Sequence, residues 1–242
     1  MNTYRKTAII VGVLYIIGTV SGVLTLVVAK PILNAPDYLV KVSATGNHVI
    51  TGALLMLVMG LALAMVPVAM FSILKRQNEA LALGYVVFRG GLETVTYIGV
   101  AISWLLLLPL SESYVQAGTP NASSFQPLGL LLLKAAETST NTTEIVFPLG
   151  ALMFSYLLYR SRLIPRWISG WGFIGAILYL AAGLLHLFGV IGQMSTITMV
   201  LVLPTGVQEM VMAVWLIVKG FNPSAIASLS AKTATNELLS AS

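Results

Sequence analysis

The chain has no cysteine and only two histidines among its 242 residues. The missing thiols exclude disulfides, thiolate metal sites, iron–sulfur clusters and the covalent attachment of a c-type haem. Two imidazoles are too few for a three-histidine zinc site. These absences narrow the choice of metal chemistry, and we expect the protein to carry no cofactor.

Charged residues are also scarce. They make up 9% of the chain, against about a quarter in an ordinary soluble domain. The mean hydropathy of +0.92 agrees with a chain whose solvent is a lipid bilayer. The net charge of +5 comes from basic residues scattered at the ends of apolar runs, with no basic stripe interleaved with aromatics. The composition therefore predicts a membrane protein with lipid as its surroundings and no nucleic acid as a partner.

Six apolar stretches are long enough to cross a bilayer, which takes about 20 residues of helix. The fourth stretch is mixed, because its first half contains the polar run TSTNTTE. It predicts either one long helix partly enclosed by its neighbours or an interfacial helix before a short span. The six stretches are Thr7 to Ala29, His48 to Leu74, Leu81 to Leu108, Leu128 to Tyr159, Trp167 to Val190 and Thr196 to Val218.

Between these stretches the sequence offers short connections. Segments 30–47 and 109–127 are rich in turn-forming residues, and we expect ordered caps or loops there. Residues 221–242 are rich in Ser and Ala after a helix-breaking Asn-Pro pair. We therefore expect one all-α membrane domain over 1–220 and a short, weakly ordered tail over 221–242.

The distribution of basic residues predicts the orientation. If the N-terminus is cytoplasmic, nine basic residues fall on that side and two on the other. Basic residues accumulate on the cytoplasmic side of membrane proteins, so both termini are predicted to lie in the cytoplasm. The nine are Arg5, Lys6, Lys75, Arg76, Arg160, Arg162, Arg166, Lys219 and Lys232, and the two are Lys30 and Lys41.

The stretch GYVVFRGGLETVTYIG at 84–99 places Arg89 and Glu93 inside an apolar run. A charge near the bilayer centre costs roughly 2.5–3.5 kcal/mol, so each needs a partner or a wet cavity. Four residues apart, the two share one helix face. Glu209 in the last stretch lies at matching depth, about 15 Å from its end by helix rise. We expect these three to form one cluster, with Gly90 and Gly91 permitting close approach beside it.

This cluster has one positive and two negative groups. One of Glu93 and Glu209 must then be protonated, or be balanced by a cation or a ligand. The sequence leaves two readings open: a neutral Glu209 that only ties helices together, or a site for a ligand or proton. Gln208 adjoins Glu209 but points about 100° away, so at most one of the two is central to the cluster.

A second group of polar residues lies toward the opposite ends of the stretches. It consists of His48, His186 and Glu144, which we predict as further ligand-binding residues. The alternative is that they are interfacial and hydrated. Two histidines on different helices would also suit a b-type haem. The sequence contains no nucleophile elbow, Walker loop, H-E-x-x-H or acidic metal motif.

Three segments give the chain a recognisable family pattern: FRGGLE at 88–93, YRSRLIPRW at 159–167 and QEMVMAVWLIVKGFNPSAI at 208–226. In these it resembles a family of bacterial integral membrane proteins known as a domain of unknown function, numbered four-three-eight-six. The resemblance implies a bacterial inner-membrane protein with several helices and no assigned activity, so no site residues carry over. The stretch KAAETSTNTTEIVFPLG departs from the family's more apolar pattern, which ranks Glu144 below Arg89 and Glu209.

From these observations we predict a six-span membrane protein that binds or transports a small molecule or a proton. An intramembrane enzyme acting on a lipid or isoprenoid is the first alternative, and it requires a cavity open to lipid near Glu93 or Glu209. A scaffold whose charges only fix helix packing is the second. A second copy of the chain is a further expected partner.

Overall fold

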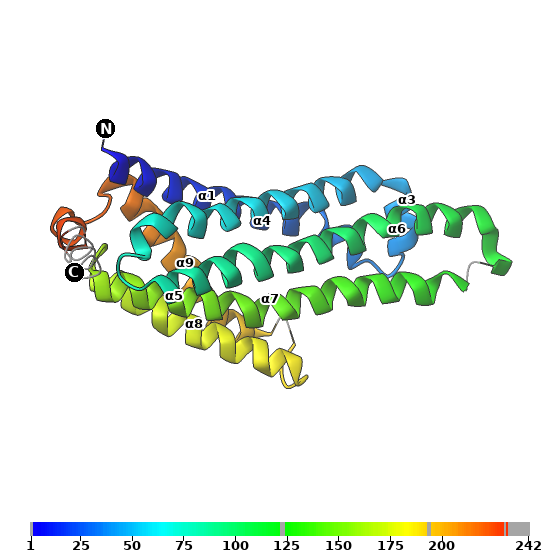
Figure 1. Ribbon diagram of the computed structural model, residues 1–242. Coiled ribbons are helices and arrows are strands. Elements are labelled where there is room, and N and C mark those ends of the chain that lie inside the picture. The colour runs from blue at the N-terminus through cyan, green and yellow to red at the C-terminus, as the bar shows by residue number, and fades with distance from the viewer. Residues whose placement is uncertain (1, 122–123, 193–194, 230, 232–242) are drawn as a thin grey trace. The chain divides into compact units, whose positions relative to one another are not determined.

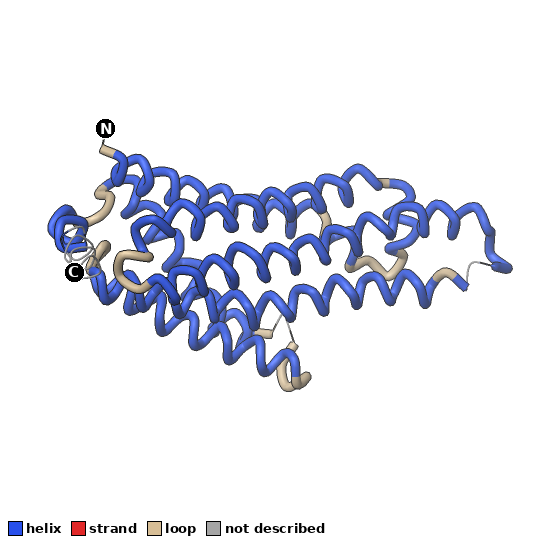
Figure 2. Tube along the Cα trace, in the orientation of Figure 1, coloured by secondary structure: helices blue, strands red, loops and turns tan. Residues whose placement is uncertain are grey.

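The computed structural model describes residues 2–121, 124–192, 195–229 and 231. This part of the chain is helical nearly throughout and contains no strand (Figures 1 and 2), which confirms the predicted all-α fold. The helices are α1 (Thr3–Val28), α2 (Lys30–Leu33), α3 (Tyr38–Ala44), α4 (Gly46–Leu74), α5 (Glu79–Tyr85), the π-helix η1 (Val86–Leu92), α6 (Glu93–Asn121), α7 (Gln126–Ser161), α8 (Arg166–Leu187) and α9 (Thr196–Val218).

Six helical segments are long and apolar enough to cross a membrane, judged by length and composition. They correspond to the six predicted stretches. The mixed fourth stretch is one continuous helix, α7, of 36 residues, which selects the first of its two predicted forms. Its hydroxyl side chains donate to carbonyl oxygens one turn back, as Thr140 does to Ala136 at 3.0 Å. Such bonds let a polar run remain helical in apolar surroundings.

The predicted connection over 109–127 is wrong for most of its length, because α6 continues to Asn121. The first turns of this extension keep their side-chain hydroxyl groups bonded to the helix: Ser113 donates to the carbonyl oxygen of Pro109 at 2.9 Å. Segment 30–47 is an ordered cap that contains α2 and α3. Within it, the hydrogen bond from Lys41 lowers the pKa of the Asp37 carboxyl below its usual range.

The described chain forms two compact units. Unit 1 comprises residues 1–16, 62–93 and 144–242, and unit 2 comprises residues 17–61 and 94–143. Unit 2 has its own apolar core, in which Trp104 and Leu107 of α6 are buried with Val42 of α3 and Val49 of α4. The predicted single membrane domain over 1–220 stays a prediction.

Unit 1 is built around the pair α8 and α9, which pack directly on each other. Glycines of α8 permit the close approach: a Cβ at Gly175 would lie 2.8 Å from the hydroxyl oxygen of Thr205. A Cβ at Gly183 would lie 2.6 Å from the carbonyl oxygen of Glu144 on α7. Small residues at such contacts are the usual way in which membrane helices pack.

After α9 the chain turns at Gly220 and forms a short helix over 223–229. Ala225 and Leu229 of this helix are buried. Most of the predicted tail, namely residue 230 and residues 232–242, lies outside the described residues.

Candidate functional site

The π-helix η1 is the local feature that positions Arg89. A π-helical turn is rare in proteins and is found mostly at functional sites. Here it includes Gly90 and Gly91, which place no side chain in the way of the altered turn. Gly90 faces α4, where its Cβ would lie 3.5 Å from Pro67, whereas Gly91 faces open space. A Cβ at Gly90 would make only an ordinary contact, so the closer approach to this turn is at Gly150 of α7, whose Cβ would lie 3.2 Å from the backbone nitrogen of Arg89.

Arg89 joins both predicted carboxylates. Its Nη1 donates to Oε1 and Oε2 of Glu93, at 3.0 and 3.1 Å. Its Nη2 donates to Oε1 of Glu209 at 2.9 Å. Arg89 and Glu93 are buried, and the Glu209 side chain is 16% exposed. The predicted three-residue cluster is thus confirmed as a set of contacts, while its role in binding stays a prediction.

Aromatic rings surround the guanidinium group of Arg89. Its Cζ lies 4.5 Å from the ring centroid of Phe147 on α7 and 5.7 Å from that of Tyr15 on α1. The hydroxyl oxygens of Tyr15 and Tyr85 are 3.2 Å apart. Tyr85 stacks on Phe154 with 4.5 Å between centroids. These ring faces stabilise the positive charge where water does not reach it.

A small cavity lies beside the cluster, between Tyr15, Arg89, Thr205, Gln208 and Glu209. Its volume of about 10 Å³, measured for the centres of water-sized spheres, is room for about one water molecule. Two buried polar atoms of its lining, Arg89 Nε and Thr205 Oγ1, have no hydrogen-bond partner within the described chain. The cavity is therefore of water size and has polar groups on part of its wall.

Gln208 also lines this cavity, but it has a different partner. Its Nε2 donates to the carbonyl oxygen of Ile168 on α8 at 3.1 Å. Of the two neighbours on α9, Glu209 contacts Arg89, and Gln208 ties α9 to α8. This agrees with the expectation that at most one of them is central to the cluster.

The hydrogen bonds indicate which carboxyl takes an added proton. Both oxygens of Glu93 accept from Arg89, as an ionised carboxylate does. Glu209 accepts from Arg89 through Oε1 and lines the water-sized cavity. The cluster otherwise has two negative charges against one positive, so Glu209 is the group that geometry favours for the extra proton.

A second buried cluster joins Glu144 of α7, His186 of α8 and Thr198 of α9. Nδ1 of His186 bonds to Oε2 of Glu144. Its Nε2 lies 2.9 Å from Oγ1 of Thr198, which in turn donates to the carbonyl oxygen of Gly192 at 2.8 Å. His186 and Glu144 were predicted from the sequence to belong together, whereas Thr198 was not predicted, because its position in the first turn of α9 is ordinary for a threonine.

The Gly192 carbonyl fixes the direction of these hydrogen bonds. A carbonyl oxygen only accepts, so it takes the single hydroxyl proton of Thr198. Thr198 Oγ1 must then accept from His186, and Nε2 of His186 carries a proton. One more proton lies between Nδ1 and Glu144, either as imidazolium with carboxylate or as neutral imidazole with carboxylic acid. The contact between Nδ1 and Glu144 is therefore a hydrogen bond with one shared proton.

His48 is exposed at the first turn of α4 and belongs to unit 2, so it is described apart from His186. Both ring nitrogens of His186 are engaged, by Glu144 and Thr198, and neither is available to a haem iron in this arrangement. Within the described ranges, no three His, Asp or Glu side chains come together as a metal ion requires. The contacts within the two clusters are thus hydrogen bonds and ion pairs among their own side chains.

A family model provides the comparison with known sequences. It is described as "Domain of unknown function (DUF4386)" and matches residues 10–220, which is most of the chain. The comparisons with curated proteins and with solved structures found no match. The six apolar helices and the two buried clusters therefore belong to a member of the DUF4386 family.

Proposed function

We propose that this chain is a bacterial inner-membrane protein, with both termini in the cytoplasm, that binds and transfers protons. The six apolar helices and the excess of basic residues on one side support the location and orientation. Proton binding is assigned to Glu209 in the Arg89 cluster and to the Glu144–His186 pair. A bound small molecule and a second copy of the chain stay predictions from the sequence.

The observation that carries this proposal is the charge of the Arg89 cluster beside a cavity of water size. A buried carboxylate without its own counter-charge is costly in apolar surroundings. The cavity of about 10 Å³ has no room for an organic cation. A metal cation would lie next to the positive charge of Arg89 and would need several oxygen ligands. A proton on Glu209 balances the charge without either cost.

The second cluster supports transfer rather than binding alone. Glu209 and Thr198 are three helical turns apart on α9, about 16 Å by helix rise. Tyr179 of α8 packs its ring edge-on against that of Phe147, which lies over Arg89, with 4.8 Å between the two ring centroids. Its hydroxyl group can donate and accept, as a group between two proton sites must. We infer that a proton passes between the two clusters along this face of α8 and α9.

The geometry favours proton binding over the enzymatic alternative. A cavity of water size does not admit a lipid or isoprenoid chain beside Glu209. In the second cluster the proton of Thr198 is directed to Gly192, whereas a nucleophilic hydroxyl would direct it to the histidine base. The scaffold alternative differs from our proposal in one measurable respect, because a scaffold carries no protons across the bilayer.

Proton flux into liposomes tests the proposal. The full chain is reconstituted with a pH-sensitive dye enclosed, and a pH difference is imposed with valinomycin and potassium to balance charge. We expect a flux above that of protein-free liposomes, and its loss in Glu209→Gln, which has no titrating group at 209.

Glu137→Gln is the matched control, because Glu137 is an exposed carboxylate paired with Lys134 outside both clusters. It should keep the full flux. Equal flux with protein and without it, or full flux in Glu209→Gln, would overturn proton transfer through this cluster.

A further inference from the structure

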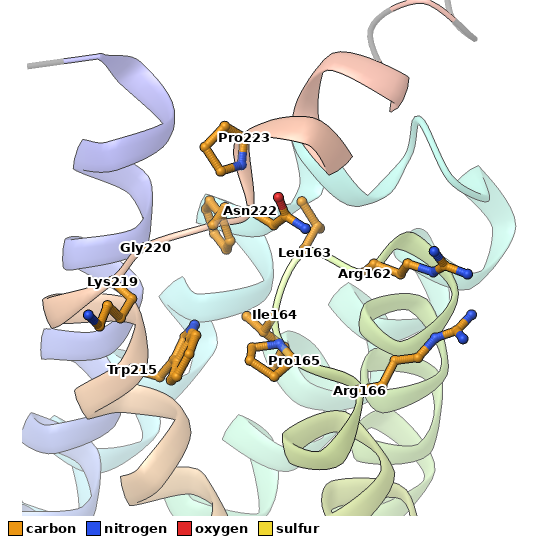
Figure 3. A pocket seen from close by; sticks show the side chains of 11 residues that line it. Arg162, Leu163, Ile164, Pro165, Arg166, Trp215, Lys219, Gly220, Asn222 and Pro223 are labelled. Atoms are coloured by element: carbon orange, nitrogen blue, oxygen red, sulfur yellow. The ribbon is translucent and has the colours of Figure 1, made fainter.

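A larger pocket lies in unit 1 where the loop after α7 meets the loop after α9. Its volume is about 590 Å³, and its lining includes Arg162, Pro165, Arg166, Trp215, Lys219 and Phe221 (Figure 3). It is far larger than the water-sized cavity beside Arg89 and shares no residue with it. Neither the family description nor the proposed proton function assigns it a ligand.

Hydrogen bonds to backbone carbonyl oxygens fix the segments that form this pocket. The amide of Asn222 donates to the carbonyl oxygen of Leu163 at 2.9 Å, which ties the two loops together. Gly220 turns the chain after α9 with a φ of 76°. Arg5 of α1 donates to the last carbonyl oxygens of α9, at 3.1 Å to Leu216 and 2.6 Å to Ile217. The pocket is therefore formed by ordered, hydrogen-bonded segments of unit 1.

The walls of the pocket are apolar and its rim is basic. Leu163, Ile164 and the ring of Trp215 form much of the wall. In Figure 3, Arg162 and Arg166 extend on one side of the pocket and Lys219 stands on the opposite side. Within the described part of the chain, no Asp or Glu lines it. This combination favours an anion that carries an apolar body.

The backbone at Arg162 adds a second indication. Its φ of 57° is left-handed, at a position after a helix where glycine is usual. A side chain with Cβ is strained there, and such strain is retained mostly at functional positions. Arg162 is exposed and is one of the residues at the rim of the pocket.

The pocket lies at a membrane boundary, because α8 begins at Arg166 and α9 ends at Val218, next to Lys219. Basic pockets between membrane helices on the cytoplasmic side bind the headgroups of anionic lipids. We propose that this pocket binds one anionic phospholipid, whose phosphate is attracted by the basic rim of Arg162, Arg166 and Lys219. The glycerol and first acyl carbons would contact Trp215 and Ile164. The apolar walls favour a lipid over a free phosphate ion.

Native mass spectrometry of the delipidated full chain tests this binding. Short-chain phosphatidylglycerol and phosphatidylcholine are added at equal concentration. We expect roughly tenfold more bound phosphatidylglycerol, since each basic side chain attracts the anionic headgroup. In Arg162→Gln/Lys219→Gln the preference should fall close to equality. Inorganic phosphate in excess should leave the bound lipid in place, because it lacks the apolar body.

A matched control is Lys6→Gln/Lys75→Gln, which removes two exposed basic residues outside the pocket lining. It should keep the preference. If the control loses the preference equally, if the pocket variant keeps it, or if phosphate displaces the lipid, the proposal is overturned. Should the pocket variant not fold, Arg162→Gly/Lys219→Gln gives the same test without backbone strain at 162. None of these outcomes depends on proton flux.

Discussion

Arg89 and Glu209 are 120 residues apart in the chain, and a hydrogen bond of 2.9 Å joins Nη2 of the arginine to Oε1 of the glutamate. The same arginine holds Glu93 through Nη1. One buried guanidinium group thus faces two carboxyl groups. This relationship leads to predictions about stability as well as about protons.

Removing the arginine leaves two buried carboxyl groups without their cation. We expect Arg89→Gln to lower the free energy of unfolding by about 3–5 kcal/mol. The loss should shrink as the pH falls, because protons then neutralise Glu93 and Glu209. Thermal unfolding in detergent across a pH series measures both effects. Lys75→Gln, at an exposed position, should shift stability by less than about 0.5 kcal/mol. Equal stability of Arg89→Gln and the wild type would contradict the cluster.

Two glycines near Arg89 should respond oppositely to alanine. At Gly91 a Cβ meets nothing within 4 Å, and alanine should stabilise the turn by up to about 1 kcal/mol. At Gly150 of α7 a Cβ would lie 3.2 Å from the backbone nitrogen of Arg89, so alanine should cost about 1–3 kcal/mol. Unfolding midpoints of the two variants provide the comparison. The prediction is wrong if Gly150→Ala is the better tolerated of the two.

Thr198 should matter as an acceptor for His186. Thr198→Val leaves the Nε2 proton of His186 buried without a partner, at a cost of about 1–3 kcal/mol. Thr198→Ser keeps the hydroxyl and should stay close to the wild type. Nitrogen NMR of ¹⁵N-histidine protein should show Nε2 protonated. A wild-type spectrum with Nε2 unprotonated would contradict the direction inferred from the Gly192 carbonyl.

Because the backbone is strained at Arg162, we expect a glycine at this position to stabilise the fold and to weaken phosphatidylglycerol binding. Arg162→Gly should raise the free energy of unfolding by about 1 kcal/mol, because glycine adopts a φ of 57° without strain. The same variant should lose part of the preference for phosphatidylglycerol. Unfolding midpoints and lipid binding measured on the same preparation test both. A stability below that of the wild type would show that Arg162 supports the fold instead.

Much of the fold could be predicted because a helix that crosses a membrane must be apolar over about 20 residues, so apolar runs in the sequence locate the helices. The six spans followed from apolar runs, and the clustering of Arg89, Glu93 and Glu209 followed from the cost of burying a charge. The depth of each residue along its helix was enough to place Glu209 opposite Arg89. These inferences needed only helix rise and charge balance.

Other features depend on the local path of the backbone. Two adjacent glycines permit a π-helical turn but equally permit an ordinary helix, so η1 could not be inferred from RGG alone. The extension of α6 past Pro109 and the role of Thr198 depend on which carbonyl each hydroxyl reaches. The sequence shows which residues carry a hydroxyl group, but it does not show which carbonyl oxygen accepts each hydroxyl proton.

The most direct test of a proton on Glu209 is infrared spectroscopy of the carbonyl stretch of protonated carboxyl groups, at neutral pH, with hydrogen–deuterium exchange to identify the band. We expect one carboxylic acid signal from the Arg89 cluster in the wild type, none in Glu209→Gln and two in Arg89→Gln. Any signal from Glu144 is common to all three and cancels in the differences. An identical carboxylic acid band in the wild type and in Glu209→Gln would contradict our account.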